Sequence, residues 1–376
     1  MAKKCYVGVD GKARKVKKGY VGVDGKARKI KKAYIGIGGV ARPCFSGEPE
    51  LAYYGKITNF SYGRFYAAAT SVGNYALFGG GTDGSYRYEM VEAYNTSLSR
   101  SSPTYMSVGR MYLAATAVGS YALFGGGYDN NGRYTNAVDA YNTSLTKSTP
   151  TAFGEARGEL AATTVGNYAL FGGGMKSNNQ SNAVDVYDTS LTRSASELYF
   201  LAPNLSATTV GNYALFAGGV NNGTTISAVT AFNSSLTKSM PTDLSAGRYG
   251  MAATSVGGYA LFGGGYYIRS STYKYVDTVD AYNTSLTRST PTVLSAARYY
   301  LAATTVGNYA LFGGGGTGSR FKTVDAYDAS LTRSTATSLN EAKEMLAATT
   351  VGNYALFGGG YASSGKSATV DAYTVV

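Results

Sequence analysis

A block of fourteen residues recurs seven times in this chain, and this repetition constrains the fold more than any local feature does. At residues 161–174 the block reads Ala-Ala-Thr-Thr-Val-Gly-Asn-Tyr-Ala-Leu-Phe-Gly-Gly-Gly. Successive copies begin 46, 47, 45, 46, 50 and 45 residues apart, so one repeating unit accounts for nearly everything from residue 55 onward. The glycine that follows the valine marks each copy, at Gly73, Gly119, Gly166, Gly211, Gly257, Gly307 and Gly352.

Each copy has the pattern of four short strands and no helix. Its apolar residues come in short runs rich in β-branched and aromatic types, separated by Gly, Asn, Pro and Ser-Thr clusters. In the sixth copy we expect strand a at 301–306, b at 309–312, c at 323–327 and d at 335–339. Four antiparallel strands in each of seven repeats predict an all-β fold, a seven-bladed β-propeller of four-stranded blades.

The repeat resembles a known family. Tyr-Ala-Leu-Phe-Gly-Gly followed by Val-Asp-Ala-Tyr is similar to the kelch repeat, from residue 55 to the end of the chain. Kelch blades usually carry a tryptophan in strand d, whereas this chain has none. The resemblance therefore implies looser blade packing than is usual in the family, with a recurrent leucine in place of the tryptophan. These leucines are Leu98, Leu145, Leu191, Leu236, Leu286 and Leu331.

The two ends of the repeat array predict a closed ring. The last copy stops after strand c, at residues 370–373, and lacks its own strand d. The β-like segment 56–61 stands immediately before the first copy, so we expect it to complete the last blade and to remove both sheet edges. The predicted domains are a module at 1–46 and the propeller at 47–376.

The N-terminal module carries nearly all the net charge. Its 46 residues hold 13 Lys and Arg against 2 acidic residues, a net of +11 out of +12 for the chain. A period of 14 places Asp10-Gly11 and Asp24-Gly25 at predicted hairpin turns. Three hairpins bury little core alone, so we expect self-association, which leaves a homo-oligomer open, or docking on a larger body. The basic residues have three interpretations, in order of preference: solvated faces, a docking surface for an acidic partner, and nucleic-acid binding.

The same module resembles short tyrosine-glycine, lysine-rich repeats that open many structural proteins of phages and prophages. This resemblance implies that the module anchors the propeller in a virion or tail assembled in the bacterial cytoplasm. The alternative location is the cytoplasm itself. We expect no membrane insertion, because the sequence has neither a secretory signal nor an apolar run of membrane-spanning length. Cys5 and Cys44 are expected to be reduced thiols.

The amino-acid composition gives little support for a catalytic function. The chain has no histidine, which excludes Ser-His and Cys-His nucleophilic systems and the usual zinc or copper ligand sets. We therefore expect no enzymatic activity, no metal and no cofactor. Residues 360–367 match the P-loop pattern but lead into a strand rather than a helix, so nucleotide binding is not expected either. One carboxylate recurs in six copies and is interpreted as architectural: Glu92, Asp139, Asp185, Asp280, Asp325 and Asp371, with Thr230 in the fourth copy.

The copies differ mainly on one predicted face. In antiparallel blades the b–c loops and the d–a connections share one face of the disc, and we call it the variable face. The turns on the other face are nearly constant in sequence, which simple drift of loops does not explain. The b–c loops are 82–90, 128–137, 175–183, 220–228, 266–278, 316–323 and 361–369.

The d–a connections carry the strongest candidate for a binding site. Nine residues before each marker glycine stands a basic residue in six of seven copies, followed by two residues that vary freely. The basic residues are either repeated contacts to backbone or a ring that binds carboxylate or phosphate groups of a ligand. The six are Arg64, Arg110, Arg157, Arg248, Arg298 and Lys343, with Ala202 in the fourth copy. The other candidate ligand-binding residues are Tyr66, Tyr112, Tyr128, Arg133, Glu159, Tyr249, Tyr266, Tyr267, Tyr299 and Tyr300.

These observations predict a non-enzymatic recognition protein. The variable face is rich in Tyr, Asn, Ser, Gly and Arg, the residues of adaptable binding surfaces. We expect an adhesin of a phage or prophage tail that binds a host surface glycan or protein. A cytosolic kelch scaffold that binds a protein partner is the alternative. An enzyme acting on an acidic sugar is a third class, because a fold does not fix a function.

Overall fold

The computed structural model describes residues 49–177, 179–269 and 272–376, together with the backbone of six strands among the first 46 residues. The chain divides into two compact units, Met1–Leu51 with Val375–Val376, and Ala52–Thr374. The boundary falls after residue 51 rather than the expected 46. Glu50 and Val376 exchange two backbone hydrogen bonds of 3.0 and 2.9 Å, which tie this stretch to the end of the chain.

The first unit contains three antiparallel hairpins among its described strands. Val9 lies opposite Lys12 and Val23 opposite Lys26, so two residues connect each of the first two strand pairs. The Asp-Gly pairs predicted at these turns, like Cys5, lie outside the described residues. The strands are β1 (Tyr6–Val9) with β2 (Lys12–Lys15), β3 (Gly19–Val23) with β4 (Lys26–Ile30), and β5 (Lys32–Ile37) with β6 (Val40–Ser46).

The second unit is built from seven four-stranded antiparallel sheets within the described residues. Strands a are β8 (Ala68–Val72), β13 (Ala114–Val118), β18 (Ala161–Val165), β24 (Ser206–Val210), β30 (Ala252–Val256), β36 (Ala302–Val306) and β41 (Ala347–Val351). Strands b are β9 (Tyr75–Gly79), β14 (Tyr121–Gly125), β19 (Tyr168–Gly172), β25 (Tyr213–Ala217), β31 (Tyr259–Gly263), β37 (Tyr309–Gly313) and β42 (Tyr354–Gly358). Strands c are β10 (Val91–Asn95), β16 (Val138–Asn142), β22 (Ala183–Asp188), β28 (Val229–Asn233), β34 (Val279–Asn283), β38 (Val324–Asp328) and β45 (Val370–Val375). Strands d are β11 (Arg100–Ser101), β17 (Lys147–Ser148), β23 (Arg193–Glu197), β29 (Lys238–Ser239), β35 (Arg288–Ser289), β39 (Arg333–Ala336) and β7 (Leu51–Ile57).

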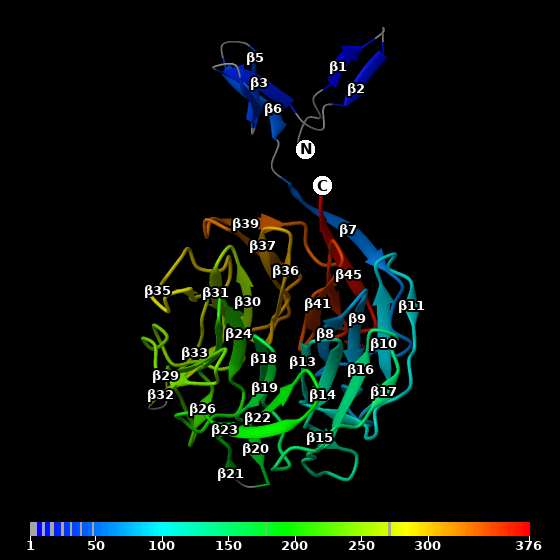
Figure 1. Cartoon of the computed structure of the whole chain (residues 1–376), viewed down its shortest axis with the longest axis vertical. Helices are drawn as coiled ribbons and strands as arrows, with labels where there is room; N and C mark the ends of the chain where they lie inside the picture. The colour runs from blue at the N-terminus through cyan, green and yellow to red at the C-terminus, as the bar shows by residue number, and fades with distance from the viewer. Residues whose placement is uncertain are drawn as a thin grey trace. The chain divides into compact units, whose positions relative to one another are not determined.

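The sheets are arranged as the blades of a propeller. Each strand a contacts the strand a of the next sheet, and the last, β41, contacts the first, β8. Figure 1 shows these strands nearest the centre, with strands such as β11, β17 and β35 at the rim. The predicted all-β propeller class is therefore confirmed. Side chains between neighbouring sheets form the core, which is why the alternate residues of every strand a are buried.

The last sheet takes its outer strand from the N-terminal side of the array. β7 lies beside β45, but it runs from Leu51 to Ile57 rather than over the expected 56–61. Side chains fix this earlier start: the Tyr53 hydroxyl donates a 2.8 Å hydrogen bond to Asp371, and its ring packs 5.2 Å from that of Tyr373. Beyond Ile57 the chain turns inward and buries Phe60, so no strand continues to residue 61.

The recurrent leucines lie at the c–d turns, where all six have a positive φ between 60° and 63°. Several of them, such as Leu98 and Leu145, pack in or against the core. Another apolar residue lies four positions before each basic residue, and before Ala202 in the fourth copy; it packs in the core and is at most 4% exposed. These residues are Phe60, Met106, Phe153, Leu198, Leu244, Leu294 and Leu339.

The b–c loops form short hairpins or turns that pair with the d–a connection of the same blade. β12 (Arg110–Met111) pairs with β15 (Tyr128–Asp129), and β40 (Lys343–Glu344) pairs with β43 (Tyr361–Ala362). The two segments that vary in sequence thus lie against each other on one face. The remaining loop strands are β20 (Met175–Lys176), β21 (Asn179–Gln180), β26 (Val220–Asn221), β27 (Thr224–Thr225), β32 (Tyr266–Arg269), β33 (Thr272–Tyr275) and β44 (Gly365–Lys366).

The P-loop-like segment belongs to these loops. β43 turns into β44, and the chain then enters β45. Lys366 forms a 2.8 Å ion pair with Asp83 of the first blade, which gives it a structural contact between two b–c loops. In the described part of the chain, no helix is long and apolar enough to cross a membrane.

Candidate ligand-binding site

A cavity of about 200 Å³ opens where the seven d–a connections converge. Two consecutive residues from every repeat line it. One residue of each pair stands two positions after the recurrent basic residue, or after Ala202 in the fourth copy, and varies freely between copies. We call these seven residues the mouth ring: Tyr66, Tyr112, Glu159, Asn204, Gly250, Tyr300 and Met345. The second residues form an apolar collar: Ala67, Leu113, Leu160, Leu205, Met251, Leu301 and Leu346.

Every residue of the mouth ring has a left-handed backbone, with φ between 50° and 64°. Backbone hydrogen bonds join neighbours in the ring: the Asn204 N–H donates to the Glu159 carbonyl at 2.8 Å, and the Met345 N–H donates to the Tyr300 carbonyl at 2.8 Å. This conformation costs a non-glycine residue roughly 1–2 kcal/mol, and glycine adopts it freely. Gly250 is the one glycine among these seven residues. The other six carry a side chain in a backbone conformation that favours glycine.

Three tyrosines form one side of the mouth. The ring centroid of Tyr66 lies 4.3 Å from that of Tyr112 and 5.8 Å from that of Tyr300. Burial raises the pKa of all three phenols, so they are neutral at physiological pH. This side offers aromatic ring faces and hydroxyl groups to a ligand.

The opposite side of the mouth is polar. The Asn204 amide nitrogen donates to Oε2 of Glu159 at 2.8 Å, and the Tyr134 hydroxyl lies 3.5 Å from Oε1. Burial raises the pKa of Glu159, and these two hydrogen bonds oppose the shift only in part. In the part of the chain that the structure describes, no group of three or more His, Cys, Asp or Glu side chains could hold a metal ion.

A second cavity of about 720 Å³ adjoins the mouth between the second and third blades. It shares Tyr112 and Glu159 with the mouth, so one surface continues from the centre of the disc onto the loops. Tyr128, Tyr134 and the exposed Arg133 supply most of its functional groups. The mouth and this side groove bring together six of the predicted residues: Tyr66, Tyr112, Glu159 and Tyr300 in the mouth, and Tyr128 and Arg133 in the groove.

Other predicted tyrosines cluster around the fifth and sixth blades. The Tyr299 ring lies 4.3 Å from Tyr300 and 5.7 Å from Tyr266, and Tyr249 lies 5.7 Å from Tyr266. Burial, followed by the nearby Glu344 carboxylate, raises the pKa of Tyr299 to about 12. Tyr267 lies opposite Lys274 in the β32–β33 hairpin and lines neither the mouth nor the side groove.

The prediction that the six recurrent basic residues form a ligand-binding ring is wrong. All six side chains are fully buried, and each forms an ion pair with the recurrent carboxylate of strand c in its own blade. A buried charge must be paired, and these carboxylates meet that need inside the blade, away from any ligand. The pairs are Arg64–Glu92 at 2.9 Å, Arg110–Asp139 at 2.8 Å, Arg157–Asp185 at 2.6 Å, Arg248–Asp280 at 2.6 Å, Arg298–Asp325 at 2.7 Å and Lys343–Asp371 at 3.2 Å.

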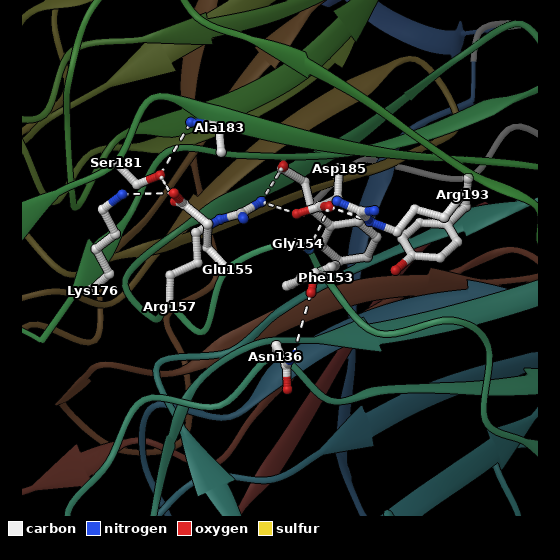
Figure 2. A network of polar contacts seen from close by, with 12 residues as sticks. Asn136, Phe153, Gly154, Glu155, Arg157, Lys176, Ser181, Ala183, Asp185 and Arg193 are labelled. Atoms are coloured by element: carbon white, nitrogen blue, oxygen red, sulfur yellow. Dashed lines mark hydrogen bonds and ion pairs between the residues drawn. The ribbon is translucent and has the colours of Figure 1, made fainter.

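Figure 2 shows this buried network in the third blade. The Asp185 carboxylate forms the ion pair with Arg157. It also accepts hydrogen bonds from Nε of Arg193 at 2.5 Å and from the backbone N–H of Gly154 at 3.1 Å. The Arg157 guanidinium also lies over the Phe153 ring, 4.8 Å from its centroid. The carboxylate thus joins strands c and d to the d–a connection and fixes the backbone that presents the mouth residue two positions later.

The fourth copy contains the signal that could have revealed this pairing. It has Ala202 in place of the basic residue and Thr230 in place of the carboxylate, so both members of the pair are missing together. The same blade has Phe232 where six blades have a tyrosine, such as Tyr141, whose hydroxyl donates to the Thr104 carbonyl at 2.7 Å. Joint loss of two residues within one repeat indicates a contact between them.

The fold and the converging connections define this molecule as a β-propeller with a central mouth. No family model matches the chain, and no curated protein matches it. A solved structure titled "Structure of YjhT" is similar to it, with a TM-score of 0.56 over 85% of this chain and 98% of that chain. Their sequences are 11% identical, and 637 chains of solved structures match, so the likeness shows the fold alone.

Proposed function

We propose that the propeller is a kelch-type, non-enzymatic recognition module that binds a surface glycan through the mouth ring and the adjoining side groove. One observation carries the proposal. In an array of nearly identical repeats, the mouth ring varies freely and keeps six side chains in a backbone conformation that favours glycine. Strained positions of this kind persist where the side chain has a use.

The chemistry of the mouth suits a sugar better than a flat protein surface. The site is concave and combines aromatic faces with an amide, a carboxylate and phenol hydroxyls, which fit a ligand with apolar faces and many hydroxyl groups. The groove beside it has room for further sugar units. A protein partner remains an outcome of the test described next.

Replacing Tyr300 with alanine tests the proposal, because this ring lies in the mouth and supports no ion pair. On a glycan array the variant should lose at least about tenfold in binding, since stacking and desolvation at such an aromatic contribute more than about 1.4 kcal/mol. The matched control is Tyr121→Ala, a half-buried tyrosine at an a–b turn on the opposite face. Equal glycan binding by the two variants would reject the site, and binding of protein but not glycan would favour the scaffold alternative.

We also propose that residues 1–46 attach the propeller to a larger virion or tail assembly. The support is the net charge of +11 on a segment whose described strands form two-stranded hairpins, together with its resemblance to repeats of phage structural proteins. Purified particles from a strain carrying the gene should contain the full chain and lack a chain without residues 1–46. Salt-sensitive binding of the segment to DNA, with no association to particles, would overturn the anchoring role.

A further inference from the structure

Glu159 is a partly buried carboxylate that lines the central cavity of the variable face. Among the described residues it forms no ion pair, and its hydrogen-bond donors, Asn204 and Tyr134, are neutral. Three other carboxylates of this face do have a cationic partner: Glu155 with Lys176 at 2.6 Å, Glu344 with Arg320 at 3.3 Å and Asp83 with Lys366 at 2.8 Å.

The surroundings of Glu159 indicate what kind of group could pair with its carboxylate. The carboxylate shares the central cavity with the rings of Tyr66, Tyr112 and Tyr300. Ring faces attract cations through their quadrupole, and the attraction grows when the site is partly desolvated. A carboxylate and three tyrosines around one small cavity therefore offer both kinds of contact that an organic cation prefers.

We propose that the mouth binds the ammonium group of its ligand, with Glu159 as the counter-charge and the three tyrosines as an aromatic cage. This inference rests on the proposed function and names the group by which the ligand is recognised. The cavity of about 200 Å³ is smaller than the roughly 300 Å³ at which drug-sized pockets begin, so it holds one protruding group. The rest of the glycan then lies in the side groove, where Arg133 is exposed.

An anionic group fits this site poorly. The six basic residues beneath the mouth are buried and already paired, so none is available to a ligand. An anion in the central cavity would instead lie beside the Glu159 carboxylate and be repelled. A neutral group would leave that carboxylate partly desolvated and without compensation.

Two pairs of small ligands test the proposal on the full chain by ligand-detected NMR titration. The first pair is choline and its uncharged isostere, in which carbon replaces nitrogen. The second is glucosamine and glucose, which distinguishes a primary ammonium from a methylated one. We expect at least one cation of the two to bind about tenfold more tightly than its neutral counterpart, because cation–π and charge contacts add about 1–2 kcal/mol.

Variants assign this preference to the mouth. Glu159→Gln should remove most of the preference for the cation, and Tyr66→Leu should weaken it. Glu344→Gln, the same change at a carboxylate that is paired with Arg320, should preserve it. A thermal melt of each variant shows that the fold is retained.

The ammonium proposal is overturned if neither cation binds more tightly than its neutral counterpart, or if Glu159→Gln keeps the full preference. Neither result affects the proposed function, which fails if the protein binds no glycan or if glycan binding is insensitive to Tyr300→Ala. The two failures are therefore distinguishable.

Discussion

At the scale of single residues, the mouth places side chains where they cost stability. Six non-glycine residues of the mouth ring have a left-handed backbone, and Glu159 is a partly buried carboxylate that forms no ion pair with the residues the structure describes. The recurrent c–d turn leucines are also left-handed, but they are the same in six copies and pack against the core. Strain combined with variation, rather than strain alone, therefore distinguishes a binding position from a packing position.

Glu159→Gln should stabilise the protein at neutral pH while it impairs ligand binding. Burial raises the pKa of Glu159 in the folded state above its unfolded value of about 4.3, so ionisation of this group opposes folding. The penalty is fully present above the raised pKa and disappears as the pH falls to the unfolded value. The melting temperature of the variant should exceed that of the parent at pH 7 and converge with it near pH 4.

Glu155→Gln is the matched control with the opposite sign. The Lys176 ammonium lowers the pKa of Glu155, so this carboxylate contributes stability above its unfolded pKa and loses it as the pH falls through the lowered value. The variant should melt slightly below the parent at pH 7, and the difference should shrink in acid. Identical pH profiles for the two variants would contradict the assigned environments.

At the scale of elements, the buried ion pair supports the d–a connection in six of the seven blades. The carboxylate accepts hydrogen bonds from the connection, as Asp139 does from the Ser107 backbone at 3.0 Å, and also pairs with a basic residue such as Lys147 at 3.2 Å. In the last blade Tyr53 of β7 supplies a donor to Asp371, because the outer strand there comes from elsewhere in the chain. The pair is thus a repeated support for the mouth, and the fourth blade shows that it can be lost as a unit.

A double-mutant cycle at Arg110 and Asp139 should show this coupling. Asp139→Thr alone leaves a fully buried guanidinium without its counter-charge and should cost about 3–5 kcal/mol in the free energy of unfolding. Adding Arg110→Ala, which recreates the residues of the fourth blade, should recover a substantial part of that loss. Denaturant unfolding of the parent, both single variants and the double variant measures the interaction, and strict additivity would exclude the coupling.

At the scale of the whole molecule, the chain closes its ring by pairing β7 with β45. Without β7, β45 would present an unpaired edge to solvent. The contact circuit among the strands a runs from β8 through β41 and back to β8, so every blade has two neighbours. Closure therefore depends on a short segment that lies outside the seven copies of the repeat block.

Deleting residues 1–57 should destabilise the propeller far more than deleting residues 1–46. The longer deletion removes β7, its backbone hydrogen bonds to β45 and the Tyr53–Asp371 bond, each worth about 1 kcal/mol. It should lower the melting temperature by several degrees and favour aggregation through the free edge. The shorter deletion should melt close to the full chain, and equal melting of both truncated proteins would show that β7 does not close the ring.

The sequence by itself determined the class of fold and the place of variation, because a repeat of 45 to 50 residues made of short β-like runs permits few architectures. It also located Tyr66, Tyr112, Glu159 and Tyr300, since they differ between copies that are otherwise alike. Only the tertiary structure decided that the recurrent basic residues are buried, because their carboxylate partners lie about 30 residues away in strand c. It alone brought seven single residues, one from each repeat, around one cavity, because convergence at the mouth is a property of the closed ring and not of any repeat.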